Sequence, residues 1–260
     1  MLNLAANLAR NAALMPDQVA IRFGQRQWTY RQFDEAASLV ANGLRARGIG
    51  SGDKVALACP NLPWFPIAYY GILKLGAVVV PINVLLKASE IAYHLSDSDA
   101  RTFLCFEGTP ELPLGQAGWD GFQEAGSCAH FITITADPAA PNPLPGGETL
   151  AALMHGQSSS FEIEPVEAGD TAVILYTSGT TGRPKGAELT HANVMMNALG
   201  VVAMVKLDRR DVQLIALPLF HSFGQVVQMN AAVLCGASMV LMARFDPDAA
   251  LAAMADYGVT

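Results

Sequence analysis

The residues best suited to chemistry lie in one short segment, YTSGTTGRPKG, at positions 176–186. Its glycines let the backbone fold closely around a ligand and turn N–H groups towards it. Its hydroxyl side chains add hydrogen-bond donors, and its lysine adds a positive charge. This combination suits a polyphosphate. The residues that we assign to the loop are Thr177, Ser178, Gly179, Thr180, Thr181, Gly182 and Lys185.

Two alternatives compete with a phosphate loop. The segment is not a Walker A loop, because no Gly-Lys-Ser/Thr follows a glycine at the required spacing. A flexible surface loop is the common outcome for a generic run of Gly, Ser and Thr. Here the segment directly follows the apolar residues 171–176, which predict a buried strand. This position and the order of the residues favour the phosphate loop.

A second candidate is His221, in the segment LPLFHSFG at 217–224. A lone histidine in an apolar stretch is more often a packed core residue than a functional one. His221, however, follows an expected strand at 212–217, and open α/β sheets place their ligands beyond the carboxyl ends of strands. We therefore expect His221 to line a site. We do not assign it as a general base.

Alternating strand and helix patterns must position these residues. Thr29 and Gln32 form a candidate capping box that opens a helix at 30–47. Asp246 and Pro247 open the last helix, and Gly258 ends it. The alternation predicts an α/β fold with mostly parallel sheets flanked by helices. Further strands are expected at 54–59, 77–81, 101–106 and 237–242, and further helices at 61–75, 90–95, 192–205 and 224–235.

Composition restricts the function further. Apolar residues make up 52% of the 260 residues and charged residues 15%, against roughly 25% charged in an average soluble domain. The net charge of −7 argues against nucleic-acid binding, which needs clustered Lys and Arg. The four scattered cysteines predict neither disulfides nor a zinc site. No apolar run of ~18 residues survives in 212–243, so we expect no transmembrane segment.

Several residues are given structural roles. We expect the three tryptophans to pack or to lie on the surface, and Lys74 and Lys87 to be solvated. Thr190 is expected to cap the helix at 192–205, with no catalytic role for His191. The pattern stops at Val259 and Thr260, where the next strand is expected, which predicts a truncated chain.

The order TSGTTGRPKG resembles the phosphate-binding signature of the adenylate-forming superfamily. This superfamily includes acyl-CoA synthetases, aryl-CoA ligases, luciferases and the adenylation domains of peptide synthetases. The resemblance extends over essentially the whole chain but over only part of a family member. It implies that 1–260 is a partial N-terminal AMP-binding domain of the acyl-CoA synthetase fold. Agreeing segments are GILKLGAVVVP at 71–81 with Asn83, LTHAN at 189–193 and LPLFHSFG at 217–224.

The resemblance also implies an activity. A carboxylate attacks the α-phosphorus of ATP, and coenzyme A then takes up the acyl group. Thr177 would help to ligate Mg²⁺, and Lys185 would act with Thr177 on the phosphates. The acid would lie near His221, Ser222, Gly224 and Gln225. Because 212–245 holds no acidic residue to pair with an ammonium group, a fatty or aryl acid fits better than an amino acid.

Several family elements do not occur in the chain, including the later motif whose Glu binds the metal and the C-terminal domain with its adenylation lysine. We therefore expect the fragment to be inactive alone, and the whole protein to be a fatty-acid–CoA ligase. The alternatives are an aryl-CoA ligase, a fatty acyl-AMP ligase or a non-catalytic nucleotide-binding module. We expect a cytoplasmic protein. Peripheral membrane contact, a homodimer and the acyl chain length are left open.

Overall fold

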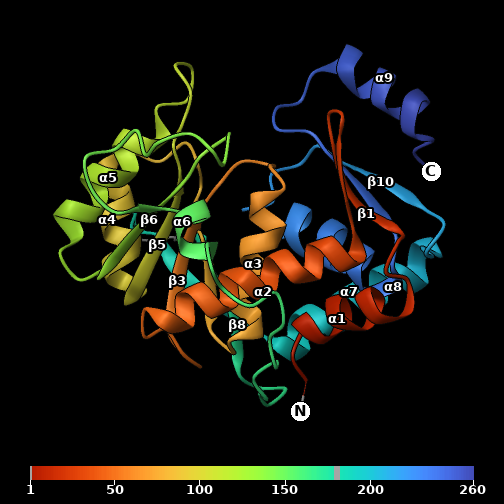
Figure 1. Cartoon of the computed structure of the whole chain (residues 1–260), viewed down its shortest axis with the longest axis horizontal. Helices are drawn as coiled ribbons and strands as arrows, with labels where there is room; N and C mark the ends of the chain where they lie inside the picture. Colours follow the sequence, from red (N-terminus) through yellow and green to blue (C-terminus); the bar gives the residue numbers. More distant parts are fainter. Residues whose placement is uncertain (1, 179–181) are drawn as a thin grey trace.

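The computed structural model describes residues 2–178 and 182–260, which form two sheets flanked by helices (Figure 1). The larger sheet has the order β7-β6-β5-β3-β4-β8-β9. Its neighbouring strands are parallel except for the last pair, β8 and β9, which are antiparallel. The strands are β3 (Lys54–Ala58), β4 (Val78–Pro81), β5 (Ala100–Phe106), β6 (His130–Ile134), β7 (Glu148–Thr149), β8 (Thr171–Thr177) and β9 (Lys185–Thr190).

The smaller sheet has the order β10-β11-β1-β2. Here β11 is parallel to both β10 and β1, whereas β1 and β2 form an antiparallel hairpin. The strands are β1 (Val19–Phe23), β2 (Arg26–Thr29), β10 (Val212–Ile215) and β11 (Ser238–Leu241). The first strands of the chain therefore join the last ones in a single sheet.

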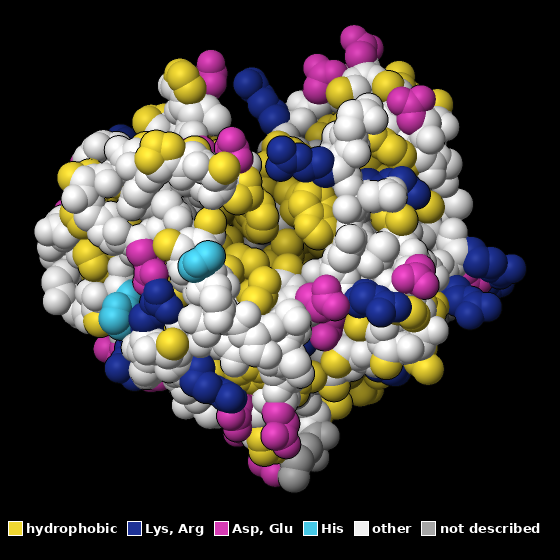
Figure 2. Space-filling view, in the orientation of Figure 1, with side chains coloured by type: hydrophobic (Ala, Val, Ile, Leu, Met, Phe, Trp, Pro, Cys, Tyr) yellow, Lys and Arg dark blue, Asp and Glu magenta, His cyan; other side chains and the backbone are white. Residues whose placement is uncertain are grey.

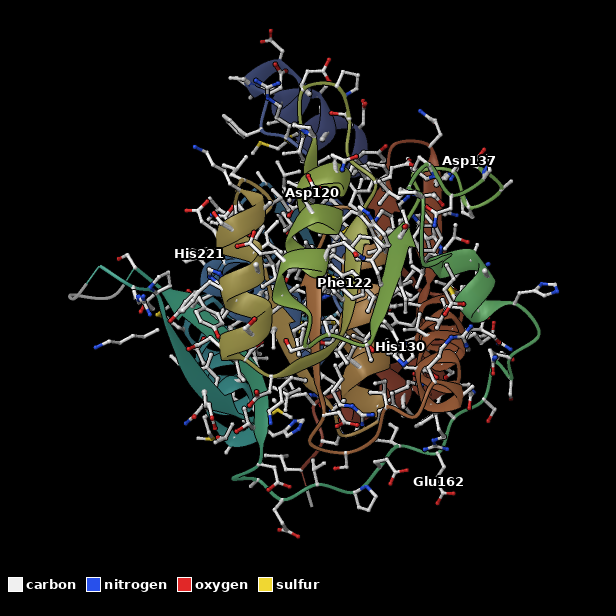
Figure 3. The ribbon with its side chains drawn as sticks, turned by 90° about the vertical axis from the view of Figure 1, so that its left-hand side faces the viewer. Asp120, Phe122, His130, Asp137, Glu162 and His221 are labelled. Atoms are coloured by element: carbon white, nitrogen blue, oxygen red, sulfur yellow. The ribbon has the colours of Figure 1, made fainter. Side chains whose placement is uncertain are left out.

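Helices cover both faces of the larger sheet. Figures 1 and 3 show α4 and α5 on one face and α2 and α3 on the other. The helices are α1 (Ala5–Leu14), α2 (Tyr30–Ala46), α3 (Trp64–Lys74), α4 (Ala88–Asp97), α5 (Leu114–Ala125), α6 (Leu150–Met154), α7 (His191–Val205), α8 (Ala231–Cys235) and α9 (Pro247–Tyr257), with the π-helical η1 (Phe223–Asn230). A parallel sheet covered on both faces has apolar strands, which agrees with the fully buried Val79 and Leu104. The predicted fold class is confirmed.

Local signals placed several boundaries correctly. The Thr29 hydroxyl accepts a hydrogen bond from the Gln32 amide, and the Gln32 side chain accepts one from the Thr29 amide, so the capping box exists. Asp246 caps α9, and Gly258 ends it in the left-handed conformation. The expected helix at 224–235 begins instead as the π-helical η1. No strand was expected at β9, β1, β2 or β6.

The prediction that Lys74 is solvated is wrong. Its side chain is buried between α2 and α3, where the ammonium group lies 2.7 Å from the carboxylate of Asp34 and donates to Ser38 Oγ at 2.8 Å. Burial lowers the pKa of Lys74, and the nearby Asp34 charge opposes that shift. Across 2–178 and 182–260, no helix combines the length and the apolar character that crossing a membrane would need.

Candidate functional site

The predicted phosphate loop connects two antiparallel strands. Thr177 ends β8 and is paired with Lys185, which begins β9. Directly opposed residues of an antiparallel pair project their side chains from the same face, so the Thr177 hydroxyl and the Lys185 ammonium group share one face of the hairpin. Both side chains are exposed, as is Ser178. The predicted residues Gly179, Thr180 and Thr181 lie outside the described part of the chain.

Two glycines are required by this hairpin. Gly182 has a φ of +85°, in the left-handed region where residues with a side chain are strained. At Gly186, opposite Tyr176, an added Cβ would lie 2.8 Å from Cγ2 of Ile174. The glycine content of the segment thus has a structural cause in the turn and in its close packing.

The segment that carries His221 follows β10 of the smaller sheet and is hydrogen-bonded to a residue that follows β3 of the larger sheet. Asn61, which follows β3, donates to the carbonyl oxygens of Ile215 and Leu217 and accepts a hydrogen bond from the Leu219 amide. Its side chain is 3% exposed. Asn61 was not singled out from the sequence, because its partners are more than 150 residues away.

His221 itself is exposed beyond the carboxyl end of β10. Its Nδ1 accepts a hydrogen bond from the Phe223 amide at 3.3 Å, which leaves Nε2 available to a ligand. Figure 3 shows His221 beside α4, on the side of the molecule that carries the β8–β9 hairpin. The strand-end placement expected from the sequence is therefore found.

The other three predicted acid-site residues have different environments. Ser222 is exposed, whereas Gly224 and Gln225 are buried at the start of η1. A Cβ on Gly224 would lie 2.4 Å from the Pro218 carbonyl oxygen, so this position allows η1 to approach the preceding segment closely. Gln225 donates to the Leu219 carbonyl oxygen at 3.3 Å. The structure thus places Gly224 and Gln225 in the packing beneath His221.

A cavity of about 330 Å³ brings the two candidate segments together. Thr177 and Ser178 line it from the hairpin, and His221 lines it from the strand end. Both segments singled out from the sequence therefore contribute residues to one cavity, although Lys185 is not among its described lining residues. The remaining lining residues are Pro81, Asn83, Leu86, Glu90, His94, Leu175, Tyr176, Pro184 and Phe220.

Glu90 and His94 of α4 were missed as site residues. Glu90 accepts a hydrogen bond from the Lys87 amide at 2.8 Å, so its carboxylate caps the start of α4. His94 Nδ1 lies 2.6 Å from the Glu90 carbonyl oxygen, and burial lowers the pKa of His94. A lowered pKa keeps the imidazole neutral at pH 7. Only their helical spacing, four residues apart, could have signalled a shared face.

A larger apolar cavity of about 560 Å³ adjoins the first and shares Phe220 with it. Asn61, Leu85, Leu217 and Phe245 are among its lining residues, which come from the carboxyl ends of both sheets. Figure 2 shows hydrophobic side chains gathered in a hollow between the two halves of the molecule. Because this larger cavity reaches Phe220, the neighbour of His221, it provides apolar surface where an acid could bind.

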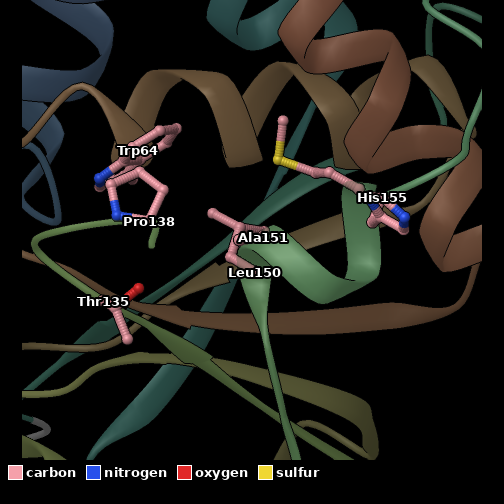
Figure 4. Close-up of a pocket in the computed structure, with 7 residues that line it drawn as sticks. Trp64, Thr135, Pro138, Leu150, Ala151 and His155 are labelled. Atoms are coloured by element: carbon pink, nitrogen blue, oxygen red, sulfur yellow. The ribbon is translucent and has the colours of Figure 1, made fainter. Parts of the chain in front are cut away.

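A separate apolar cavity of about 220 Å³ lies between Trp64, Thr135 and α6 (Figure 4). None of the predicted site residues that the structure describes lines it. Within the described ranges, no three His, Cys, Asp or Glu side chains cluster to hold a metal ion. Mg²⁺ is commonly held by one or two carboxylates together with substrate phosphates and water. A hydroxyl of a phosphate loop can add a further oxygen ligand, and the exposed Thr177 hydroxyl fits that part of the shell.

Comparison with known proteins identifies the relatives of this chain. The model of the AMP-binding enzyme family matches residues 8–260. A feruloyl-CoA synthase from Amycolatopsis sp is 33% identical over 96% of this chain and 46% of its own length. The medium-chain fatty-acid–CoA ligase of Escherichia coli (strain K12) is 32% identical over 96% of this chain and 44% of its own length.

Solved structures agree with this relationship. The anthranilate CoA ligase AuaEII, in complex with anthranoyl-AMP, superimposes with a TM-score of 0.89 at 27% identity. The match covers 99% of this chain and 48% of that one. The chain thus spans about half the length of the curated relatives that it matches. It belongs to the AMP-binding enzyme family and has the fold of the N-terminal domain of the CoA ligases that it resembles.

Proposed function

We propose that the protein to which this chain belongs joins a carboxylic acid to AMP at the expense of ATP and then forms a thioester with coenzyme A. The observation that supports this most directly is the cavity that Thr177, Ser178 and His221 line together. It offers hydroxyl and amide donors on one side and the edge of an apolar cavity on the other. A nucleotide phosphate and a carboxylic acid could therefore meet there.

The proposed reaction has two steps, each with its own leaving group. A carboxylate oxygen attacks the α-phosphorus of ATP, and pyrophosphate leaves with the bonding electrons. The thiolate of coenzyme A then attacks the acyl carbon, and AMP leaves. The hydroxyl of Thr177 and the ammonium group of Lys185 would stabilise the negative charge that moves onto the departing phosphates. Mg²⁺, held in part by Thr177, would neutralise phosphate charge.

The proposed acid is fatty or aromatic. Leu86, Leu175 and Phe220 provide apolar walls, and the larger cavity continues that surface through Leu217 and Phe245. Among the described residues that line the first cavity, Glu90 is the one carboxylate, and its Oε2 accepts a hydrogen bond from the Lys87 amide at the start of α4. The larger cavity has no carboxylate among its described lining residues, so an ammonium group bound there would lack a counter-charge. A fatty acid is our first choice and an aryl acid the second.

The relatives support both choices. The medium-chain fatty-acid–CoA ligase acts on the first class, and the feruloyl-CoA synthase and the anthranilate CoA ligase act on the second. A panel of fatty and aromatic acids, offered with ATP and coenzyme A to the complete protein, separates them by the mass of the thioester formed. An acyl adenylate without any thioester would identify a fatty acyl-AMP ligase instead.

A matched pair of lysine variants tests the phosphate loop. Lys185→Gln is expected to slow pyrophosphate release by the complete protein about 100-fold, because loss of one donor to a developing anion commonly costs ~3 kcal/mol. The exposed Lys206 provides the control, and Lys206→Gln should leave the rate unchanged. Equal rates in the two variants would contradict the proposal. ATP binding without pyrophosphate release by the unaltered protein would favour a non-catalytic nucleotide-binding module.

We also propose that the 260-residue chain alone releases little pyrophosphate. It matches only about half of each of these relatives, and the later metal-binding motif and the adenylation lysine that the resemblance implies do not occur in its residues. Pyrophosphate release by the isolated chain at a rate near that of the complete protein would contradict this proposal.

A further inference from the structure

Helix α4 contacts both arms of the β8–β9 hairpin. On the first arm, the Tyr176 hydroxyl donates to Asp97 Oδ2 at 2.7 Å. On the second arm, the Pro184 carbonyl oxygen accepts a hydrogen bond from the Tyr93 hydroxyl at 2.9 Å. Tyr93 and Asp97 are four residues apart in one helix, so they project from the same face. One turn of α4 therefore contacts Tyr176, just before the phosphate loop, and Pro184, near the end of the loop.

Ring contacts support the same arrangement. The His94 ring lies 4.2 Å from the Tyr176 ring between centroids, at an interplanar angle of 57°. Tyr93 packs edge-on against Tyr176 at 6.5 Å. The Tyr93 hydroxyl also lies 3.3 Å from Asp97 Oδ1, which connects the two hydrogen bonds through one carboxylate. The two ring contacts and the hydrogen bond to Asp97 thus fix the Tyr176 side chain at the base of the loop.

This arrangement matters because a binding loop must be ordered before it can act on a charged ligand. Donors that are already in place cost no reorganisation when charge develops, and an immobilised loop loses less entropy on binding. Strand pairing joins Thr177 to Lys185, but both residues are exposed at the loop end of the hairpin. The α4 contacts at Tyr176 and Pro184 anchor this end to the folded domain.

We propose that Tyr93 and Asp97 are positioning residues, which hold the described flanks of the phosphate loop, Tyr176 and Pro184, in place for nucleotide binding. That the ligand is a nucleotide rests on the proposed function. That Tyr93 and Asp97 hold the β8–β9 hairpin in place does not depend on it. Tyr93 and Asp97 need not touch the reacting atoms. Their effect passes through Pro184 and Tyr176.

Hydrogen exchange tests the structural content in the 260-residue chain. Tyr93→Phe and Tyr176→Phe each keep the ring and remove one hydroxyl. Amides at 185–188 are expected to exchange about fivefold faster in either variant, which corresponds to the loss of one ordinary hydrogen bond. The control is Tyr257→Phe, which removes a hydroxyl bonded to the Gly24 carbonyl oxygen far from the loop. Exchange at 185–188 as slow as in the control would overturn the proposal.

Kinetics of the complete protein test the functional content. Tyr93→Phe should raise the KM for ATP about fivefold, with kcat at saturating ATP and the melting temperature changed little. Asp97→Asn keeps an oxygen acceptor for Tyr176, so it should recover most of the affinity that Asp97→Ala loses. An unchanged KM for ATP in Tyr93→Phe would overturn the positioning role. Failure of the unaltered protein to release pyrophosphate would count against the proposed function, whereas the exchange result would still decide the role of α4.

Discussion

The Leu219 amide donates a hydrogen bond to Oδ1 of Asn61 over 2.8 Å, although 158 positions separate the two residues. Asn61 follows β3 of the larger sheet, and Leu219 follows β10 of the smaller one. The same side chain donates to the Ile215 and Leu217 carbonyl oxygens. The buried side-chain amide of Asn61 therefore joins the carboxyl ends of both sheets. Its partner Leu219 lies two residues before His221.

Asn61→Ala is expected to destabilise the chain by about 3 kcal/mol, because two buried backbone groups and one part-buried carbonyl group lose their partner together. Asn42→Ala is the matched control, since Asn42 also donates to two backbone carbonyl oxygens, those of Ser158 and Ser160, but at the surface. Its cost should stay below about 1 kcal/mol, because water replaces the lost donor. Urea unfolding of both variants measures the difference. Equal losses of unfolding free energy in the two variants would show that Asn61 does not stabilise the contact between the two sheets.

A pair of glycine variants tests the packing beneath His221. Gly224→Ala is expected to cost about 2 kcal/mol or more, because the new methyl group meets the Pro218 carbonyl oxygen at 2.4 Å and the Leu217 carbonyl oxygen at 2.8 Å. Gly200 lies on the exposed side of α7 with open space around it. There alanine should stabilise by about 0.5–1 kcal/mol through its better helix propensity. Thermal unfolding gives the sign of each change, and a neutral Gly224→Ala would refute the close approach.

The buried pair of Lys74 and Asp34 gives a third prediction. Asp34→Ala should cost about 3 kcal/mol or more, because it leaves the buried ammonium group without its counter-charge. The double variant Asp34→Ala with Lys74→Met should recover most of that loss, since methionine fills the space without a charge. A double-variant cycle by denaturant unfolding measures the coupling. Additive losses would mean that the two charges do not depend on each other.

The sequence predicted those features that depend on neighbouring residues. The capping box at Thr29 and Gln32, the apolar strand before Thr177 and the end of α9 at Gly258 are all encoded within a few positions. The candidate phosphate loop was singled out in the same way, because its glycines and hydroxyls are contiguous. Such local signals also gave the alternation of elements and hence the fold class.

What the sequence did not predict depends on contacts between distant segments. Strand β9 (KGAELT) lacks an apolar run, and it forms because it pairs with β8 across the loop. Lys74 looked like an ordinary surface lysine until Asp34 supplied its partner from another helix. Asn61, Tyr93 and Asp97 support the site through bonds over 79 to 158 positions, for which no spacing rule exists.

The buried His191 predicts how stability depends on pH. Its side chain is fully buried at the start of α7, where Nδ1 accepts a hydrogen bond from the Leu4 amide and Nε2 has no partner among the described residues. Burial lowers the pKa of His191 from 6.5 to about 4, and the nearby Asp170 charge opposes the shift only in part. A proton on His191 Nδ1 would place an N–H group against the N–H group of Leu4, which now donates to that nitrogen. The folded chain therefore resists a proton that the unfolded chain accepts.

The direction of the pH dependence of stability follows from this difference in pKa between the folded and the unfolded chain. Above pH 6.5 the imidazole is neutral in both states, so its full contribution to stability is present. Between pH 6.5 and about 4 the unfolded state binds one more proton, and stability falls by about 1.4 kcal/mol per pH unit. We expect the free energy of unfolding to drop by about 2 kcal/mol more between pH 7 and 5 in the unaltered chain than in His191→Asn. The exposed His155 is the control, and His155→Asn should keep the steep slope. Parallel pH profiles for the unaltered chain and His191→Asn would refute the assignment, because the slope reports the proton that folding excludes from this one side chain.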